Sequence, residues 1–215
     1  MRVKILGWNP INDRTSILKA SVYIKPTLKM LEFLQDSIDI QDYLYEIIKD
    51  GADHAIIFAA HNGGGIPQVG KSFYTSAIYK DWNRNNISEI PSYENISIDS
   101  EYIKNLLEVI RTGYCLNYVE EMNDSQLKHH FEHLGISQNI MYNIGVVDKQ
   151  YFYISIGTKN QKFTQNQITG IELLVNNIKN IIIKNIFFIL MQSTKYKKTT
   201  FEWLYIYLSF KVQSL

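Results

Sequence analysis

The sequence predicts an α/β domain of the α+β type, with a central antiparallel sheet of about five to six strands and flanking helices. Two pairs of apolar and aromatic runs, within 54–79 and 139–156, are each interrupted by a polar or glycine-rich stretch, which is typical of β-hairpins. Segments with apolar residues at helical spacing precede, separate and follow these pairs. With 46% hydrophobic and 20% charged residues among 215, the chain can bury a sizeable core.

The first 51 residues are predicted to hold a lead-in and a helix. We interpret residues 1–25 as a loosely attached lead-in segment with room for one short strand. Pro26 suits the first turn of a helix, where its missing N–H costs nothing, and apolar residues recur at roughly helical spacing after it. The spacing is interrupted near Ser37–Asp39, so Asp39 is expected to cap a second helical segment that ends at Gly51.

The first predicted hairpin joins an apolar run to an alternating run through a glycine cluster. Residues 54–61 form the apolar run, Gly63-Gly64-Gly65 form the cluster, and 73–79 alternate as the second strand. The polar stretch 83–97 that follows has no periodicity. It is expected to be a long loop, and long loops in compact domains often serve a site or a partner.

The rest of the chain is predicted from helix caps, glycine stops and periodicity. Its expected elements are a helix from Asp99 or Ser100 to Gly113, a strand at 114–119, a short helix from Ser125 to Gly135, a hairpin of 139–147 and 151–156 turning at Asp148-Lys149, and a helix capped by Thr164 that extends to Met191.

This order of elements resembles a GAF domain, a small α/β sensor module. The second hairpin followed by Phe163-Thr164-x-x-Gln167 resembles the usual GAF exit into the last helix. Residues 51–63 resemble a GAF-like subgroup with the pattern G-A-D-R-A-x-x-F-x-x-H-N-G, which is frequent in bacteria and their phages. His54 stands where that pattern has arginine. The resemblance implies a GAF-like domain over 26–191.

The resemblance implies a ligand pocket over one face of the sheet, under the long loop and the mid-domain helix. Aromatic side chains suit such a pocket because they stack on flat ligands and carry hydroxyl groups. Ordinary aromatic packing is the alternative for each of them. The aromatic candidates for ligand binding are Tyr74, Tyr79, Trp82, Tyr142 and Tyr153.

The stretch His61-Asn62-Gly63 is a second candidate for ligand binding. Glycines let backbone N–H groups converge on a phosphate or carboxylate. A P-loop would need a lysine and a serine or threonine at a fixed spacing, and Lys71-Ser72 lies too far along the chain. The alternative is a hairpin connection in which His61 and Asn62 satisfy the turn backbone.

No catalytic, cofactor or metal signature is identified in the sequence. His129 and His133 share a helix face at i, i+4, but a metalloprotease motif would place Glu where His130 stands, and no third ligand is identifiable. A solvated helix face is the alternative. We therefore expect a non-enzymatic domain, with a metal-dependent enzyme using His61 kept as a further hypothesis.

The remaining predictions concern partners and location. Residues 192–215 form a tail that mixes lysines with aromatics and is expected to pack against the domain or contact a partner. A homo-oligomer or assembly partner is expected through the terminal helices and this tail. The net charge is only +1, so the electrostatic field of the protein gives no indication of nucleic-acid binding. The chain has no run of about 18 apolar residues and no signal-peptide core, so no transmembrane segment is expected.

A single cysteine, Cys115, suits a reducing compartment and is predicted to be a buried, inert thiol in a strand. The expected location is the cytoplasm of a bacterial host, or a virion if the protein is phage-encoded. Two functions follow from the resemblance: a ligand sensor or assembly module, and alternatively a structural or cargo protein of a phage particle.

Overall fold

A computed structural model describes residues 14–62, 72–147, 150–159 and 162–193. The chain divides into two compact units, Met1–Asp39 and Ile40–Leu215. The predicted turn at Asp148-Lys149, the glycine cluster from Gly63 and nearly all of the 192–215 tail lie outside the described residues.

Helix α1 spans Arg14–Lys49 and therefore begins earlier than predicted. The prediction that residues up to 25 form a non-helical lead-in is wrong from Arg14 onward, and Pro26 lies inside the helix. The predicted interruption near Asp39 is also wrong. The Ser37 hydroxyl donates to the Phe33 carbonyl at 2.9 Å, and the Gln35 amide donates to the Asp39 carboxylate at 2.8 Å. Both polar groups are thus satisfied at i, i+4 spacing within a continuous helix.

The second unit is built on one six-stranded antiparallel sheet with the strand order β3-β2-β1-β6-β5-β4. The hairpins β1–β2 and β5–β6 confirm the two predicted ones. They join through β1 and β6, which places the last of the described strands in the centre. The strands are β1 His54–His61, β2 Tyr74–Trp82, β3 Ile96–Ser97, β4 Tyr114–Tyr118, β5 Gln138–Val147 and β6 Gln150–Thr158.

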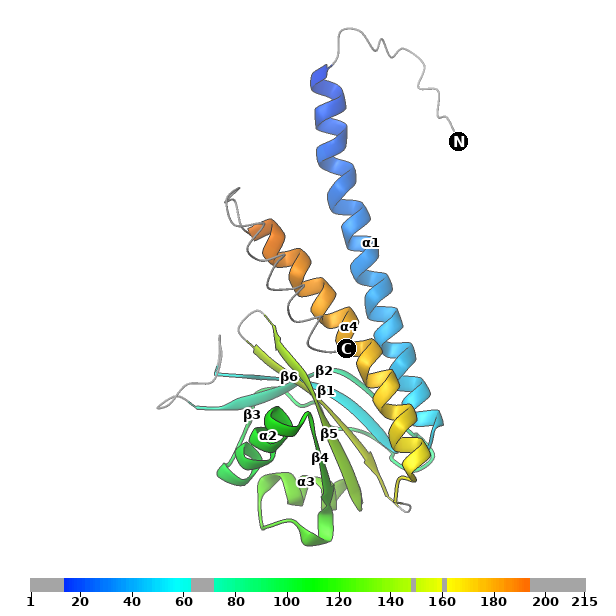
Figure 1. Cartoon of the computed structure of the whole chain (residues 1–215), viewed down its shortest axis with the longest axis vertical. Helices are drawn as coiled ribbons and strands as arrows, with labels where there is room; N and C mark the ends of the chain where they lie inside the picture. The colour runs from blue at the N-terminus through cyan, green and yellow to red at the C-terminus, as the bar shows by residue number, and fades with distance from the viewer. Residues whose placement is uncertain (1–13, 63–71, 148–149, 160–161, 194–215) are drawn as a thin grey trace. The chain divides into compact units, whose positions relative to one another are not determined.

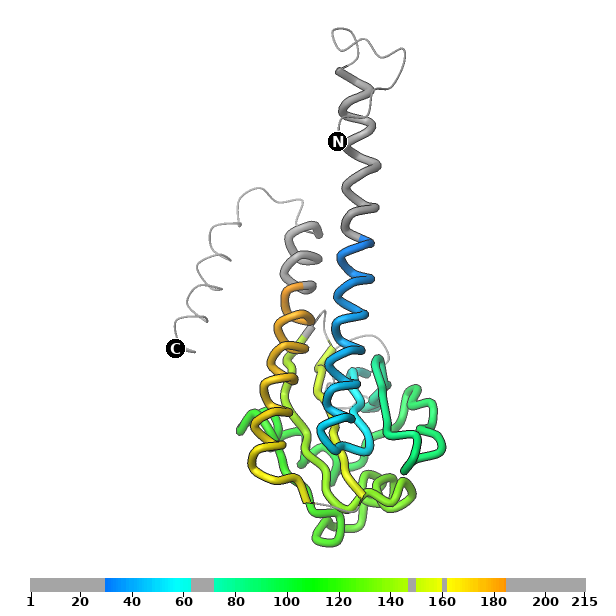
Figure 2. Tube along the Cα trace, turned by 90° about the vertical axis from the view of Figure 1, so that its right-hand side faces the viewer, coloured from blue at the N-terminus to red at the C-terminus, as the bar shows by residue number. Residues whose placement is uncertain are grey.

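Helices cover both faces of this sheet (Figure 1). The residues Ala55, Ile57 and Ala59 of β1 face a core formed with α4 (Gln165–Ser193) and the last turns of α1. Their neighbours Ile56 and Phe58 face a second core formed with α2 (Ser100–Thr112) and α3 (Gln126–Leu134). A strand covered on both faces needs apolar residues at successive positions, which explains the continuous apolar run of β1. Figure 2 shows α4 along the sheet from a second direction.

The helix boundaries in the second unit follow the predicted caps. Asp99 caps α2, Ser125 caps α3, and Gly113 and Gly135 end these helices with positive φ. Thr164 precedes α4 and caps it, together with Gln167, in a reciprocal capping box. Its hydroxyl accepts the Gln167 N–H at 3.3 Å, and the Gln167 side chain accepts the Thr164 N–H at 2.9 Å.

The motif Gly51-Ala52-Asp53 connects α1 to the central strand. Gly51 has φ +108° and donates to the Ile48 carbonyl, and Ala52 donates to the Ile47 carbonyl, which is a Schellman ending. The buried carboxylate of Asp53 then accepts from the Asn86 amide at 2.5 Å and from the Lys159 N–H at 2.7 Å. Asp53 therefore ties the start of β1 to the long loop and to the end of β6.

The polar stretch predicted as a long loop runs from Asn83 to Asp99 and contains only the two-residue strand β3. It follows β2 through backbone hydrogen bonds, from Ala77 to the Tyr93 carbonyl at 2.8 Å and from Ile98 to the Phe73 carbonyl at 3.0 Å. Within the part of the chain that the structure describes, no helix combines the length and apolarity needed to cross a bilayer.

Candidate functional site

A cavity of about 140 Å³ lies on the α2 and α3 face of the sheet. The sheet supplies its floor, and the 83–99 loop, α2 and α3 supply its walls. No described residue that lines it is a lysine, an arginine or a carboxylate. The lining residues are Phe58, Thr75, Tyr93, Ile96, Ser97, Tyr102, Gln126, Leu127 and His130.

A chain of hydroxyl groups lies beneath the cavity. The fully buried Tyr153 oxygen is 2.6 Å from that of Tyr102 and 2.9 Å from that of Thr75. The Thr75 hydroxyl also lies 3.5 Å from the Ala59 carbonyl. In the contacts of Tyr153 with Thr75 and with Tyr102, either oxygen can be the donor. Burial raises the pKa of Tyr102 and Tyr153, which keeps both phenols protonated. Because a phenol both donates and accepts, the Tyr102 hydroxyl keeps hydrogen-bonding capacity for another group in either direction.

Tyr93 and His130 form a second polar pair in the cavity wall. The Tyr93 oxygen lies 2.6 Å from His130 Nε2, and the two rings meet edge to face with centroids 4.8 Å apart. Burial, with a smaller effect of the nearby His133, lowers the pKa of His130 to about 4. Burial also raises the pKa of Tyr93. The phenol therefore donates to a neutral imidazole at neutral pH, and the pair adds no charge to the cavity.

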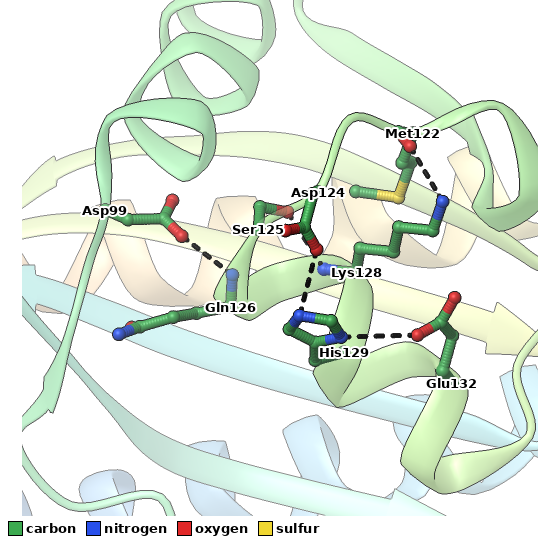
Figure 3. A network of polar contacts seen from close by, with 8 residues as sticks. All are labelled: Asp99, Met122, Asp124, Ser125, Gln126, Lys128, His129 and Glu132. Atoms are coloured by element: carbon green, nitrogen blue, oxygen red, sulfur yellow. Dashed lines mark hydrogen bonds and ion pairs between the residues drawn. The ribbon is translucent and has the colours of Figure 1, made fainter.

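Asp99 fastens α2 and α3 beside the cavity. One carboxylate oxygen accepts the Tyr102 N–H at 2.8 Å in the first turn of α2. The other accepts the Gln126 N–H at 2.7 Å at the start of α3, as Figure 3 shows. Ser125 adds the cap expected of it, since its hydroxyl accepts the Lys128 N–H at 3.1 Å. One side chain thus satisfies orphan N–H groups of two helices.

The structure separates the aromatic residues that the sequence singled out. Tyr153 lies under the cavity, where its ring stacks on Phe58 with centroids 5.3 Å apart. Trp82 packs against the same core without lining the cavity. Tyr79 and Tyr142 pack into the opposite core, beneath α4 and the last turns of α1. The prediction that they share one pocket with Tyr153 is therefore wrong. The reason is strand alternation, which sends their side chains to the other face.

His61, Asn62 and Tyr74 lie at the end of the first hairpin, away from the cavity lining. The His61 ring is buried, stacks on Tyr74 at 6.2 Å, and places Nε2 3.0 Å from the Ser76 hydroxyl. Ser76 accepts the Asn95 N–H at 2.9 Å, so this group links the hairpin to the loop. Gly63 lies outside the described residues. A ligand-binding role for His61, Asn62, Gly63 and Tyr74 stays a prediction.

His129 and His133 are exposed on α3, in agreement with a solvated helix face. His129 Nε2 lies 2.9 Å from the Asp124 carboxylate, and its Nδ1 lies 3.4 Å from Glu132 (Figure 3). Among the described residues, no group of three or more histidine, cysteine or acidic side chains could hold a metal ion. Cys115 lies in β4, half-buried rather than fully buried, and burial raises the pKa of its thiol.

Sequence reasoning missed most of the cavity. Tyr93 lies in a stretch without periodicity, and Tyr102 lies in a predicted helix with no motif that marks it as a site residue. His130 was noted only as the residue that breaks a metalloprotease motif. A signal for Phe58 was present, because it lies one residue out of phase with Ile57 and so faces the other side of β1.

Comparison with known proteins identifies the fold. No protein-family model matches the chain, and no curated protein matches it significantly. Among solved structures, the blue-light absorbing form of the Thermosynechococcus elongatus PixJ GAF domain is 12% identical, with a TM-score of 0.53. The match covers 76% of this chain and 94% of that one. The fold is GAF-like.

Two further GAF-domain structures come from a cyanobacterial phytochrome, one bound to phycocyanobilin and one to phycoerythrobilin. Each is 14% identical with a TM-score of 0.50, and they cover 82% and 79% of this chain and 96% of their own. Such low identities show the fold alone. The resemblance of residues 51–63 to a phage-associated subgroup stays a prediction.

Proposed function

We propose that this GAF-like domain is a non-catalytic sensor that binds a small, neutral, largely apolar molecule in the cavity beneath the 83–99 loop. The observation that carries the proposal is the cavity itself, which is neutral, lined mainly by apolar and aromatic groups, and placed over hydrogen-bonded hydroxyls. Ligand sites usually combine apolar walls with a few placed polar groups.

The size of the cavity limits the ligand. Pockets for drug-sized molecules measure about 300–1,000 Å³, and this one measures about 140 Å³. Phycocyanobilin, which one of the similar GAF domains holds, is far too large for that space. A single aromatic ring with one hydrogen-bond donor fits better, because the ring can pack on Phe58 and the donor can meet the Tyr102 oxygen. Phenol and indole are suitable probes.

Blocking the entrance tests the site without disturbing the core. Ser97 lines the cavity and is exposed, so Ser97→Trp should close the entrance and leave the fold intact. Ser92→Trp, at an exposed position of the same loop that does not line the cavity, is the matched control. In a titration followed by NMR, phenol or indole should shift resonances of Thr75 and Leu127 in the unmodified chain and in the control.

Ser97→Trp should abolish these shifts. Binding that survives Ser97→Trp, or shifts located elsewhere, would contradict the cavity as the sensing site. Failure of both probes and of a panel of other single-ring compounds would contradict the sensor function.

A role in assembly is favoured by a separate observation on α1. Met30, Leu31, Leu34 and Ile38 are each more than half exposed and recur at three- and four-residue steps, the spacing of a helix-pairing face. We infer that this stripe pairs with a second copy of the chain. Light scattering should show a dimer that the double variant Leu34→Lys/Ile38→Lys converts to a monomer. A monomeric unmodified chain at all concentrations would contradict this.

A further inference from the structure

Strand β4 lies at one edge of the sheet and pairs with β5 alone among the described strands. Just beyond its ends, the Asn143 N–H donates to the Gly113 carbonyl at 2.8 Å, and the Val119 N–H donates to the Ser137 carbonyl at 3.0 Å. An antiparallel strand bonds to one neighbour at every second residue, so the odd-numbered residues between 113 and 119 face β5 with their backbone groups. The even-numbered residues point theirs to the open side. We call this row the β4 edge, and it consists of Tyr114, Leu116 and Tyr118.

The middle of the β4 edge has backbone groups without a partner. The Tyr114 carbonyl accepts from the Thr112 hydroxyl, but no described residue bonds to the N–H or C=O of Leu116 or to the N–H of Tyr118. A cleft of about 250 Å³ follows this edge. Both Leu116, which packs toward α4, and Asn105 of α2, on the other face of the sheet, line it. The edge is therefore accessible to an added strand, which is the usual partner of unpaired strand backbone.

Carboxylates border the β4 edge. Glu101, which pairs with Lys104, and Glu121 line the cleft, and its described lining contains no lysine or arginine. Burial and then the nearby Glu108 raise the pKa of the Cys115 thiol, which places a third carboxylate beside the start of β4. Edge-to-edge pairing of two copies of the chain would bring these like charges together, which is unfavourable. A strand that carries lysines is favoured instead.

Residues 201–208 of the same chain have the sequence of a strand buried on both faces. Aromatic and aliphatic residues alternate along Trp203-Leu204-Tyr205-Ile206-Tyr207-Leu208, which is the period of a β-strand. Helices cover both faces of the sheet, so a strand added to it would bury both sets of side chains. The lysines that flank this run are Lys195, Lys197, Lys198 and Lys211. The run and its lysines thus match the open edge and its carboxylates.

The chain after α4 is long enough to return to β4. Helix α4 packs against β5, the neighbour of β4. It begins beside the end of β4, since the Phe163 N–H donates to the Gln138 side chain at 2.6 Å and Gln138 is the cross-strand partner of Tyr118. The 29 residues of α4 give it a length of about 43 Å. Residues 194–208 span about 50 Å when extended, so a tail that returns along α4 reaches the β4 edge.

We propose that residues 201–208 add to the β4 edge as a seventh strand of the sheet, within the same chain. Backbone groups of this segment bond to those of Leu116 and Tyr118, and its flanking lysines lie near the carboxylates of Glu108 and Glu121. The β4 edge shares no lining residue with the cavity beneath the 83–99 loop, the sensing cavity, so each proposal can fail alone.

Amide hydrogen exchange of the full chain, followed by NMR, tests the added strand. The N–H groups of Leu116 and Tyr118 should exchange at least about tenfold more slowly than exposed amides. The Asn117 N–H faces β5 and should be protected in every variant, which reports an intact sheet. Fast exchange of Leu116 and Tyr118 in the unmodified chain would overturn the proposal. Protection that appears only at high protein concentration would assign the edge to a second copy and overturn it as well.

Proline substitutions in the tail identify the segment that covers the edge. Tyr205→Pro and Ile206→Pro change successive residues, so one of them removes an N–H that faces β4 and should release the protection of Leu116 at least about tenfold. Gln213→Pro, beyond the apolar run, is the matched control and should leave it unchanged. Protection that survives both substitutions in the run would show that another segment covers the edge.

A pair of charge reversals tests the lysines. Glu121→Lys, at an exposed position of the cleft, should speed the exchange of Leu116 about fivefold. Glu89→Lys makes the same change of charge at an exposed position of the 83–99 loop that does not line the cleft, and the exchange should stay within about twofold. Equal effects of the two variants would reject the pairing of the lysines with this edge.

Discussion

The carboxylate of Asp99 accepts the backbone N–H of Gln126 at 2.7 Å, across 27 residues of sequence, while it also caps its own helix. This contact joins the first turns of α2 and α3. Tyr102 and Gln126 both line the sensing cavity. One side chain therefore sets the spacing of the two helices that bound this cavity.

Removing this double cap should destabilise the domain. Asp99→Ala leaves two helix-terminal N–H groups without an acceptor, and each lost cap is worth about 1 kcal/mol, so the free energy of unfolding should fall by about 2 kcal/mol. Asp99→Asn keeps one acceptor oxygen and should lose about half as much. Urea unfolding measures both. Asp124→Ala removes only the exposed contact with His129 and should change stability by less than about 0.5 kcal/mol. Equal effects at positions 99 and 124 would contradict the double cap.

The phenol of Tyr153 should stabilise the cavity floor through both of its hydrogen bonds. Tyr153→Phe leaves the ring in place and removes partners from Tyr102 and Thr75, which should lower the free energy of unfolding by about 1–2 kcal/mol. The loss should be smaller in a Thr75→Val background, where one of the partners is already absent. Tyr114→Phe, at a half-exposed position, is the control and should be near neutral. Full additivity of the changes at positions 75 and 153 would show that the two hydroxyls do not interact.

Two glycine-to-alanine substitutions should change the stability of the domain in opposite directions. A Cβ on Gly157 would lie 2.3 Å from the buried ring of His54, so Gly157→Ala should destabilise the domain by about 1–3 kcal/mol. A Cβ on Gly170, within α4, meets only Asp50 at 3.6 Å, and Gly170→Ala should stabilise by about 0.5–1 kcal/mol. Thermal unfolding compares the two variants. A stable Gly157→Ala domain would mean that the His54 ring can move away.

The buried His54 should make stability depend on pH. Burial lowers the pKa of His54 from 6.5 to about 3, with a smaller effect of His130, so protonation favours the unfolded chain. The contribution of neutral His54 is complete above pH 6.5 and is lost as the pH falls toward 3. At pH 5 this loss is about 2 kcal/mol. His54→Leu should therefore flatten the decline in stability between pH 7 and pH 5, as measured by urea unfolding.

The exposed His133 provides the control for this experiment. His133→Gln should keep the decline seen in the unmodified chain, because its side chain is in contact with solvent. An unchanged decline in the His54→Leu variant would assign the pH dependence to other groups, of which His130 is the first candidate because burial lowers its pKa to about 4.

Local sequence signals predicted the elements of the second unit well because their causes are local. A capping side chain such as Ser125 or Thr164 acts within three residues, and a glycine such as Gly135 ends a helix by its own backbone conformation. The alternation in 73–79 is typical of a strand with one buried face, and the continuous apolar run of 54–61 is typical of a strand buried on both faces. Both patterns are local. The error at Pro26 has a different origin, because a proline inside a helix removes one backbone hydrogen bond and local signals therefore place it at a helix start, whereas α1 continues through it.

The sequence by itself determined the α+β class, the two hairpins and the helix caps, since each depends on contacts over a few residues. Only the tertiary structure decided which strands meet and which side chains share a face. The pairing of β1 with β6 brings Asp53 to Lys159, and strand alternation sends Tyr153 to the cavity and Tyr142 to the opposite core. Contacts such as Asp99 with Gln126 or Tyr93 with His130 join residues about 30 positions apart. Local sequence patterns cannot predict such contacts. The candidate sites consist of such contacts, which is why the sequence indicated a sensor-like fold and missed most of its cavity.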